Sequence, residues 1–217
     1  VADRIARRRG FANANAVAEE VIALVLAAYR HVIPADASTR TGAWEKKRFM
    51  GRELSKKTVG IVGLGNIGQL VAQRLAGFDN RIIVYDPVVS ADKAEELGAE
   101  LCSLQELFAA ADIITLHLPE TDETQGMINR DLLNVTKPGA ILINCARAGI
   151  VNEEDVRAVK ADKDLIFCTD VYAADAPGEK SVADIADIML PHLGPNTSEA
   201  NRNAACRAAE QLVAYVQ

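Results

Sequence analysis

Four side chains that could do acid–base or anion-binding chemistry follow shortly after apolar runs: Arg147, Asp170, Asp175 and His192. An arginine can hold a substrate carboxylate through paired hydrogen bonds and polarise a carbonyl. A histidine can give or take the proton that accompanies hydride transfer, and a nearby carboxylate would fix its tautomer. Because parallel strands end at one edge of a sheet, this spacing allows a catalytic triad. The alternative is a set of surface loop charges with a capping histidine.

The segment Gly63-Leu64-Gly65-Asn66-Ile67-Gly68 has the G-x-G-x-x-G spacing, directly after an apolar run and at the start of an amphipathic pattern. The first glycine permits a tight turn, the second leaves space for a pyrophosphate, and the third allows close packing of helix and strand. Free N–H groups and the positive end of the helix dipole then face the phosphates. The segment therefore predicts a dinucleotide-binding loop.

Asp86 ends the next apolar run, about 18 residues after Gly68. A carboxylate at this spacing accepts hydrogen bonds from the ribose hydroxyls and repels a 2′-phosphate, which favours NAD over NADP. The alternative is a glycine-rich turn with an unrelated aspartate at the end of a strand.

The elements that must position these residues alternate along the chain. Apolar runs predict strands at 58–62, 81–85, 112–116, 140–144 and 165–169, and a further apolar run at 187–190 precedes His192. Helical patterns fall at 66–78, 91–97, 104–110, 130–134 and 153–161. This order predicts an α/β fold with a doubly wound parallel sheet of the Rossmann type.

Two long helices are expected to flank this core. The first covers 14–33, and because 21–29 is apolar all round, it should pack on its own domain and also on a partner subunit or a further domain. Pro34 is expected to end it, with His31 near its C-terminal dipole and a polar loop over 35–57. The second covers 197–216, with Asn196 and Glu199 as a capping box. Its expected buried stripe is Ala200, Ala204, Ala208, Leu212 and Val216.

We therefore expect one dinucleotide-binding domain over 1–217. It divides into a flexible lead at 1–12, a crossover helix and loop at 13–57, a Rossmann core at 58–195 and a return helix at 196–217.

Composition narrows the function classes. The 217 residues carry a net charge of −6, which disfavours a nucleic-acid partner. No apolar run is long enough to span a bilayer, so a cytoplasmic protein is expected. The four cysteines form no C-x-x-C pair, which favours reduced thiols and disfavours a metal site.

Several motifs in order resemble the nucleotide-binding domain of the D-isomer-specific 2-hydroxyacid dehydrogenases. They are Asn13-Ala-Asn-Ala-Val-Ala-Glu19, the 63–68 loop with Tyr85-Asp86-Pro87, Leu116-His-Leu-Pro-Glu-Thr121, Asn144-Cys-Ala-Arg-Ala-Gly-Ile-Val151, Asp170-Val-Tyr172 and Pro191-His-Leu-Gly194. The resemblance covers nearly the whole chain after about residue 10.

The resemblance implies roles for individual residues. Arg147 takes the place of the substrate-orienting arginine, His192 that of the acid–base histidine, and Asp170 that of an aspartate near the nicotinamide carboxamide. It also implies cofactor contacts from Asn66, Ile67, Pro87, His117, Leu118, Pro119, Thr124, Cys145, Ala146 and Gly194. For His117, the favoured interpretation is a satisfied histidine at the end of a strand or a neighbour of the adenosine.

The chain departs from the family in two ways. The family usually pairs its histidine with a glutamate, but the corresponding position is Asp175, one methylene shorter, so its direct pairing with His192 is an open question. Family members also usually carry about a hundred residues forming a substrate domain, and the chain begins at the crossover helix. We therefore expect either a cofactor domain of a longer enzyme or a protein that uses NAD without turnover.

The leading hypothesis is the catalysis-bearing NAD domain of a D-2-hydroxyacid dehydrogenase, poorly active alone, whose partners are a 2-hydroxy or 2-keto acid and the missing substrate domain. A homodimer is expected through the 14–33 helix and the following loop. The alternative is a non-catalytic, NAD-responsive interaction protein resembling corepressors. An NADP reductase of another class is disfavoured by Asp86 and by the Arg147 and His192 motifs.

Overall fold

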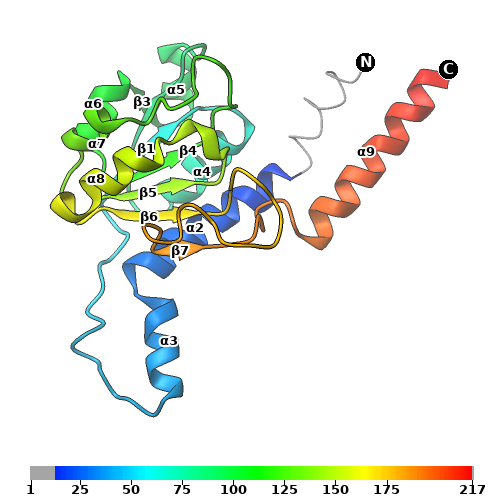
Figure 1. Cartoon of the computed structure of the whole chain (residues 1–217). Coiled ribbons are helices and arrows are strands. Elements are labelled where there is room, and N and C mark those ends of the chain that lie inside the picture. The colour runs from blue at the N-terminus through cyan, green and yellow to red at the C-terminus, as the bar shows by residue number, and fades with distance from the viewer. Residues whose placement is uncertain (1–12, 217) are drawn as a thin grey trace.

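The computed structural model describes the backbone of residues 13–216, with side chains over 13–210 and at 213, so the predicted lead at 1–12 lies outside it. Seven parallel strands form one sheet in the order β3-β2-β1-β4-β5-β6-β7 (Figure 1). They are β1 Thr58–Val62, β2 Arg81–Tyr85, β3 Ala99–Leu101, β4 Ile113–Leu116, β5 Ile141–Asn144, β6 Ile166–Thr169 and β7 Ile188–Met189. This confirms the doubly wound parallel sheet. The short β3 was not predicted, because three residues carry too little pattern.

The strand register aligns the ends of six strands. Val62 pairs with Tyr85 on one side and with Leu116 on the other, and the line continues through Asn144, Thr169 and Met189. The chain runs outward from β1 to β3 and then returns to build β4–β7 on the other side. The ends of β1 and β4 therefore flank the topological switch point, where sheets of this kind bind their ligands.

Two helical layers cover the sheet. On one face lie α2 Ala14–Tyr29, α4 Asn66–Ala76 and α5 Ala91–Glu96. On the other lie α6 Leu104–Ala110, α7 Arg130–Val135 and α8 Glu153–Lys163. Strand side chains alternate between the two cores: Val59 and Ile61 face the first, and Val62 faces the second. At Gly60, a Cβ would lie 2.4 Å from Leu107 Cδ2, so glycine is what lets α6 approach β1.

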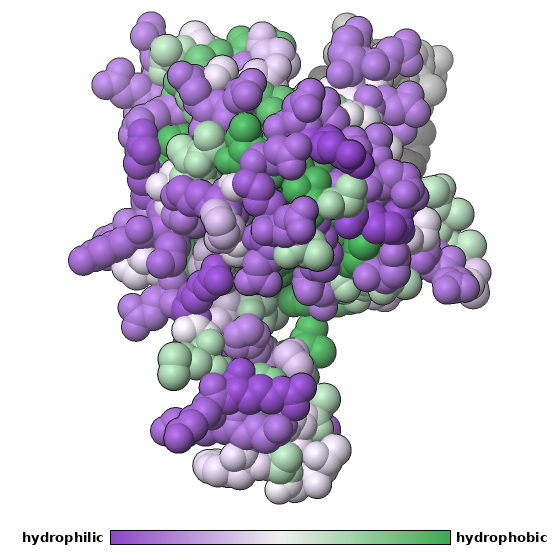
Figure 2. Space-filling model, turned by 60° about the vertical axis from the view of Figure 1, so that its left-hand side comes forward, coloured by the Kyte–Doolittle hydropathy of each residue, from purple (hydrophilic) through white to green (hydrophobic). Residues whose placement is uncertain are grey.

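The prediction of one helix over 14–33 is wrong. α2 ends at Tyr29, His31 adopts a left-handed conformation with φ 51°, and a separate helix, α3, covers Val32–Arg40. Pro34 does not end a helix but lies in the first turn of α3, where its missing N–H has no partner to lose. The predicted loop over 35–57 therefore begins with helix. α3 buries none of its residues, and it projects with the following loop as a separate lobe at the bottom of Figure 2.

The final helix, α9 Ser198–Val216, forms where predicted but leaves the body of the domain (Figure 1). Ala200 is buried, whereas Ala204 and Ala208 are exposed, so the predicted buried stripe is wrong at these two positions because no other described element covers this face. Leu212 and Val216 lie outside the described side chains. The cap also differs from the prediction, since Thr197 Oγ1 accepts a hydrogen bond from Ala200 N at 3.1 Å. None of the described helices is long and apolar enough to cross a membrane.

Candidate cofactor and catalytic site

The glycine loop joins β1 to α4, and its three glycines meet different constraints. Gly63 has φ 100°, and a Cβ there would lie 2.9 Å from the backbone of His117. A Cβ on Gly68 would lie 2.1 Å from the carbonyl oxygen of Gly63, so this glycine is required by packing. At Gly65, by contrast, a Cβ would meet nothing within 4 Å. The open space at Gly65, beside the first N–H groups of α4 including those of Asn66 and Ile67, is a cradle that suits an anionic group.

Asp86 follows β2 and holds the loop in shape. Its Oδ2 accepts a hydrogen bond from Leu64 N at 2.8 Å, and its Oδ1 accepts from Val88 N at 2.9 Å and Val89 N at 3.1 Å. These bonds leave acceptor capacity on a carboxylate that is only partly buried. The predicted ribose-binding residue is therefore also a structural residue of the loop, and Pro87 next to it is exposed.

His117 follows β4, and only one of its two ring nitrogens has a hydrogen-bond partner. Its Nε2 lies 3.0 Å from Thr115 Oγ1, but its buried Nδ1 has no hydrogen-bond partner. Burial lowers the pKa of His117 to about 3, so the ring is neutral at physiological pH. A neutral imidazole with one unpaired nitrogen at the nucleotide edge fits a ligand contact.

The segment after His117 is held as a compact turn. Leu118 is buried against the glycine loop, because a Cβ on Gly63 would lie 3.0 Å from Leu118 Cδ2. Thr124 Oγ1 donates a hydrogen bond to the carbonyl of Pro119 at 2.7 Å and accepts one from Thr121 N at 2.8 Å. Thr124 thus shapes the loop that presents Pro119.

The turn after β5 is organised by Asn144, which the sequence analysis did not single out. Its buried side chain accepts from Ala146 N at 3.1 Å and donates to the carbonyl of Arg147 at 2.8 Å. Cys145 and Ala146 are buried, whereas Arg147 is exposed and its Nη1 donates to the carbonyl of Ala146 at 2.6 Å. An asparagine directly after a strand can form hydrogen bonds with the backbone of the following turn. Its position in the sequence could therefore have predicted a structured turn here.

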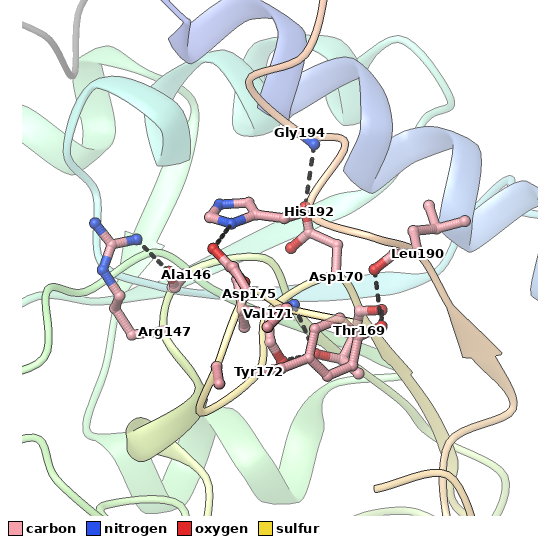
Figure 3. Close-up of polar contacts among 12 residues, drawn as sticks. Ala146, Arg147, Thr169, Asp170, Val171, Tyr172, Asp175, Leu190, His192 and Gly194 are labelled. Carbon is pink, nitrogen blue, oxygen red and sulfur yellow. Dashed lines mark hydrogen bonds and ion pairs between the residues drawn. The ribbon is translucent and has the colours of Figure 1, made fainter. Parts of the chain in front are cut away.

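Asp170 follows β6 and is 1% exposed. Its Oδ2 accepts a hydrogen bond from Gly194 N at 3.1 Å, and its Oδ1 is buried without a partner (Figure 3). Leaving a buried carboxylate oxygen unpaired is costly, so a donor from a bound molecule would satisfy it.

Asp175 reaches His192 despite its shorter side chain. His192 Nδ1 lies 2.6 Å from Asp175 Oδ2, and the pair is partly exposed (Figure 3). His192 also has φ 53°, a conformation that is uncommon for a non-glycine residue and that clusters at functional sites. Pairing at Nδ1 leaves Nε2 for proton exchange.

The same histidine and aspartate line a groove of about 670 Å³ together with Arg147 and Glu120. Glu120 Oε2 accepts a hydrogen bond from Gly149 N at 3.2 Å and so ties this loop to the turn that carries Arg147. Tyr172 also lines the groove, and its hydroxyl donates to the carbonyl of Leu190 at 2.7 Å. Arginine, histidine and carboxylate therefore meet around one open groove.

One group of possible metal ligands occurs among the described residues. Glu20, Cys145 and Asp170 place one ligand atom each within 4.8 Å of one another. Burial, together with the carboxyl groups of Asp170 and Glu20, raises the pKa of the Cys145 thiol well above its ordinary value. A thiol that holds its proton is a poor metal ligand, because the thiolate is the binding form.

The parallel sheet, the glycine loop at its switch point and the acidic residue after β2 define a dinucleotide-binding domain. A family model described as "D-isomer specific 2-hydroxyacid dehydrogenase, NAD binding domain" matches residues 22–194. The chain belongs to this family, and the matched residues are its NAD-binding domain.

Known relatives agree with this assignment. A D-3-phosphoglycerate dehydrogenase of Mycobacterium tuberculosis is 44% identical over 202 residues, which cover 92% of this chain and 38% of the relative. The NAD-dependent formate dehydrogenase of Staphylococcus aureus, solved in complex with NAD, has a TM-score of 0.85 and 30% identity, covering 95% of this chain and 63% of that one. D-2-hydroxyisocaproate dehydrogenase has a TM-score of 0.87 and 27% identity, covering 95% and 66%.

Proposed function

We propose that this domain binds NAD and carries the groups that move a proton and orient the substrate while a 2-hydroxy acid and a 2-keto acid interconvert. The observation that carries the proposal is the pairing of His192 with Asp175 at 2.6 Å, in one groove with Arg147. The chain spans 38% of the length of the phosphoglycerate dehydrogenases that it resembles, so the activity proposed is that of a complete enzyme.

The residues of the domain fit the cofactor. The open space at Gly65 and the N–H groups at the start of α4 suit the pyrophosphate, and Asp86 suits the adenosine ribose. The buried Oδ1 of Asp170 has acceptor capacity that suits the amide of the nicotinamide carboxamide. When bound, NAD would accept or supply the hydride at the C2 carbon of the substrate.

The side chains supply the remaining chemistry. We assign His192 Nε2 as the atom that takes the hydroxyl proton in oxidation and returns it in reduction. Asp175 holds the imidazole by Nδ1 and stabilises the imidazolium that forms. Arg147 presents a guanidinium to the carboxylate and carbonyl of the substrate. For this role Arg147 must release the carbonyl of Ala146, which its Nη1 contacts here.

The proposal is tested by titrating the purified chain with NADH, followed by nucleotide fluorescence, and by offering 2-keto acids, with 3-phosphohydroxypyruvate first because of the named relatives. We expect measurable NADH binding and little or no turnover, since in this family a second domain encloses the groove and excludes water. Absence of binding to folded protein would refute the function. Robust turnover would refute the requirement for a second domain.

We also propose that the chain forms a homodimer through α2, α3 and the loop that follows. Large apolar side chains are exposed on this arm: Val32 52%, Ile33 50%, Trp44 86% and Met50 79%. Exposed apolar groups gathered on a projecting arm are typical of an interface. Sedimentation of the chain and of Trp44→Ser tests this, and a monomeric parent chain would refute it.

The alternative of a non-catalytic, NAD-responsive interaction protein finds no support. The relatives and structures named above are dehydrogenases.

A further inference from the structure

Two carboxyl groups converge behind the loop that carries His192. Glu20 comes from α2 and Asp170 follows β6, and between them lies Gly194. A Cβ on Gly194 would lie 2.8 Å from Glu20 Oε2 and 3.1 Å from Asp170 Oδ2. Glu20 Oε2 and Asp170 Oδ1 are both buried, and neither has a hydrogen-bond partner. Glycine at 194 therefore makes room for a pair of carboxyl groups that face each other.

Among the described residues, no lysine or arginine pairs with either carboxyl group. Within the described part of the chain, Cys145 and Tyr172 are the other titratable groups that interact with this pair, Cys168 lies next to Cys145, and Arg74 reaches the start of α2 from α4. The two thiols and the phenol are neutral when protonated, and the guanidinium of Arg74 contacts Asn15. The neighbouring Glu19 is exposed and accepts a hydrogen bond from Asn15. Two ionised carboxylates offer acceptors only, so a single proton between them both removes one charge and supplies the missing donor.

We propose that Glu20 is a protonated carboxylic acid that shares its proton with Asp170, and that its ionisation sets the preference of the site for oxidised over reduced nicotinamide. The second half rests on the proposed NAD-binding function, whereas the first half concerns the ligand-free chain. Burial and the adjacent Asp170 raise the pKa of Glu20 to about 8, in keeping with the geometry.

The charge of the pair explains the preference. With the proton in place the pair carries one negative charge, and without it two. The oxidised nicotinamide ring is positively charged and the reduced ring is neutral, so only the oxidised form is stabilised by the second charge. By linkage, binding of NAD+ draws the proton off Glu20, whereas binding of NADH does not. Higher pH therefore favours NAD+.

The first half is tested without ligand. The chain is labelled with ¹³C at the glutamate side-chain carboxyl, and its resonances are followed from pH 3 to pH 10. The Glu20 resonance is assigned by its loss in Glu20→Gln, with Glu19→Gln as a matched control one residue away. We expect the Glu20 carboxyl to titrate near pH 8. Titration near its ordinary value of 4.5 would overturn the proposal, whether or not NAD binds.

The second half is tested by calorimetry at pH 8 in two buffers of different ionisation enthalpy. Because Glu20 is about half protonated there, NAD+ binding should release up to about half a proton and NADH binding none. If bound NAD+ increases the acid dissociation constant of Glu20 about tenfold, the ratio of the affinity for NAD+ to the affinity for NADH should rise about fivefold between pH 7 and pH 9. Glu20→Gln should abolish both effects, and Glu19→Gln should keep them. Equal proton release by the parent chain and Glu20→Gln would overturn this half. Failure of both nucleotides to bind would instead refute the proposed function.

Discussion

Replacing Gly65 by serine tests whether this glycine is needed for ligand binding rather than for the fold. Gly65 is the N-cap of α4, with φ −72° and ψ −162°, a conformation that serine adopts readily. A Cβ meets nothing within 4 Å there. Serine is a preferred N-cap, so the free energy of unfolding should change by only a few tenths of a kcal/mol. Yet its side chain would occupy the cradle, and its hydroxyl would bind the helix N–H groups that we assign to the pyrophosphate.

The expected loss of affinity follows from those N–H groups. Losing one hydrogen bond to a charged group costs about 1.5–3 kcal/mol, which weakens NADH binding about 10- to 150-fold. Gly68→Ala provides the contrast, because its Cβ would lie 2.1 Å from the carbonyl oxygen of Gly63. Such overpacking costs about 1–3 kcal/mol and lowers the Tm by about 2–4 °C for each kcal/mol. Fluorescence titration with NADH measures the loss of affinity in Gly65→Ser, and thermal unfolding measures the loss of stability in Gly68→Ala. If Gly65→Ser binds NADH as the parent chain does, the assignment of the cradle is wrong.

Three further outcomes are expected. Asp175→Ala should remove the proton from His192 Nδ1 in part of the population, whereas Asp175→Glu should retain it. The ¹⁵N chemical shifts of the imidazole ring measure this, and identical shifts in the parent chain and both variants would contradict the pairing. Gly60→Ala should destabilise the chain by about 1–3 kcal/mol in urea unfolding, because its Cβ would lie 2.4 Å from Leu107 Cδ2, and Leu107→Ala in the same chain should relieve part of the cost. The pKa of Glu20 is raised from 4.5 to about 8, so between these pH values the folded chain holds a proton that the unfolded chain releases. The contribution of Glu20 to the free energy of unfolding should therefore fall as pH rises from 4.5 to 8. If the free energy of unfolding of Glu20→Gln has the same pH dependence as that of the parent chain, this expectation is wrong.

The central fold was predictable because its signals are local. Five runs of apolar residues became the five longer strands, within one residue at each end, since strands buried on both faces need such runs. Strand register then brought the residue after each run to one edge of the sheet. This is why Asp170, which follows β6, lies at the same edge of the sheet as the glycine loop that follows β1.

The flanking segments were not predictable in the same way. The apolar pattern of α2 continues to Ile33, but the break at His31 depends on a left-handed backbone that histidine only occasionally adopts. The small residues of α9 resemble a buried stripe, yet burial depends on another element being present to cover them. Sequence periodicity indicates which face is apolar without indicating what, if anything, covers it.

The position of Glu20 beside Asp170 could not be predicted from the sequence. Glu19 and Glu20 are adjacent and identical in type, but α2 turns by about 100° between successive residues, so one side chain is exposed and the other points at Asp170. The distinction arises only when α2 is placed across the end of β6. A helix that the sequence assigned to packing, and to a partner, thus also delivers a titratable group to the nicotinamide end of the site. The proposed dimer surface includes the same helix, although its exposed apolar side chains lie beyond the break at His31, on α3 and the loop that follows. Substitutions on α2 should therefore be assayed both for self-association of the chain and for the preference for NAD+ over NADH.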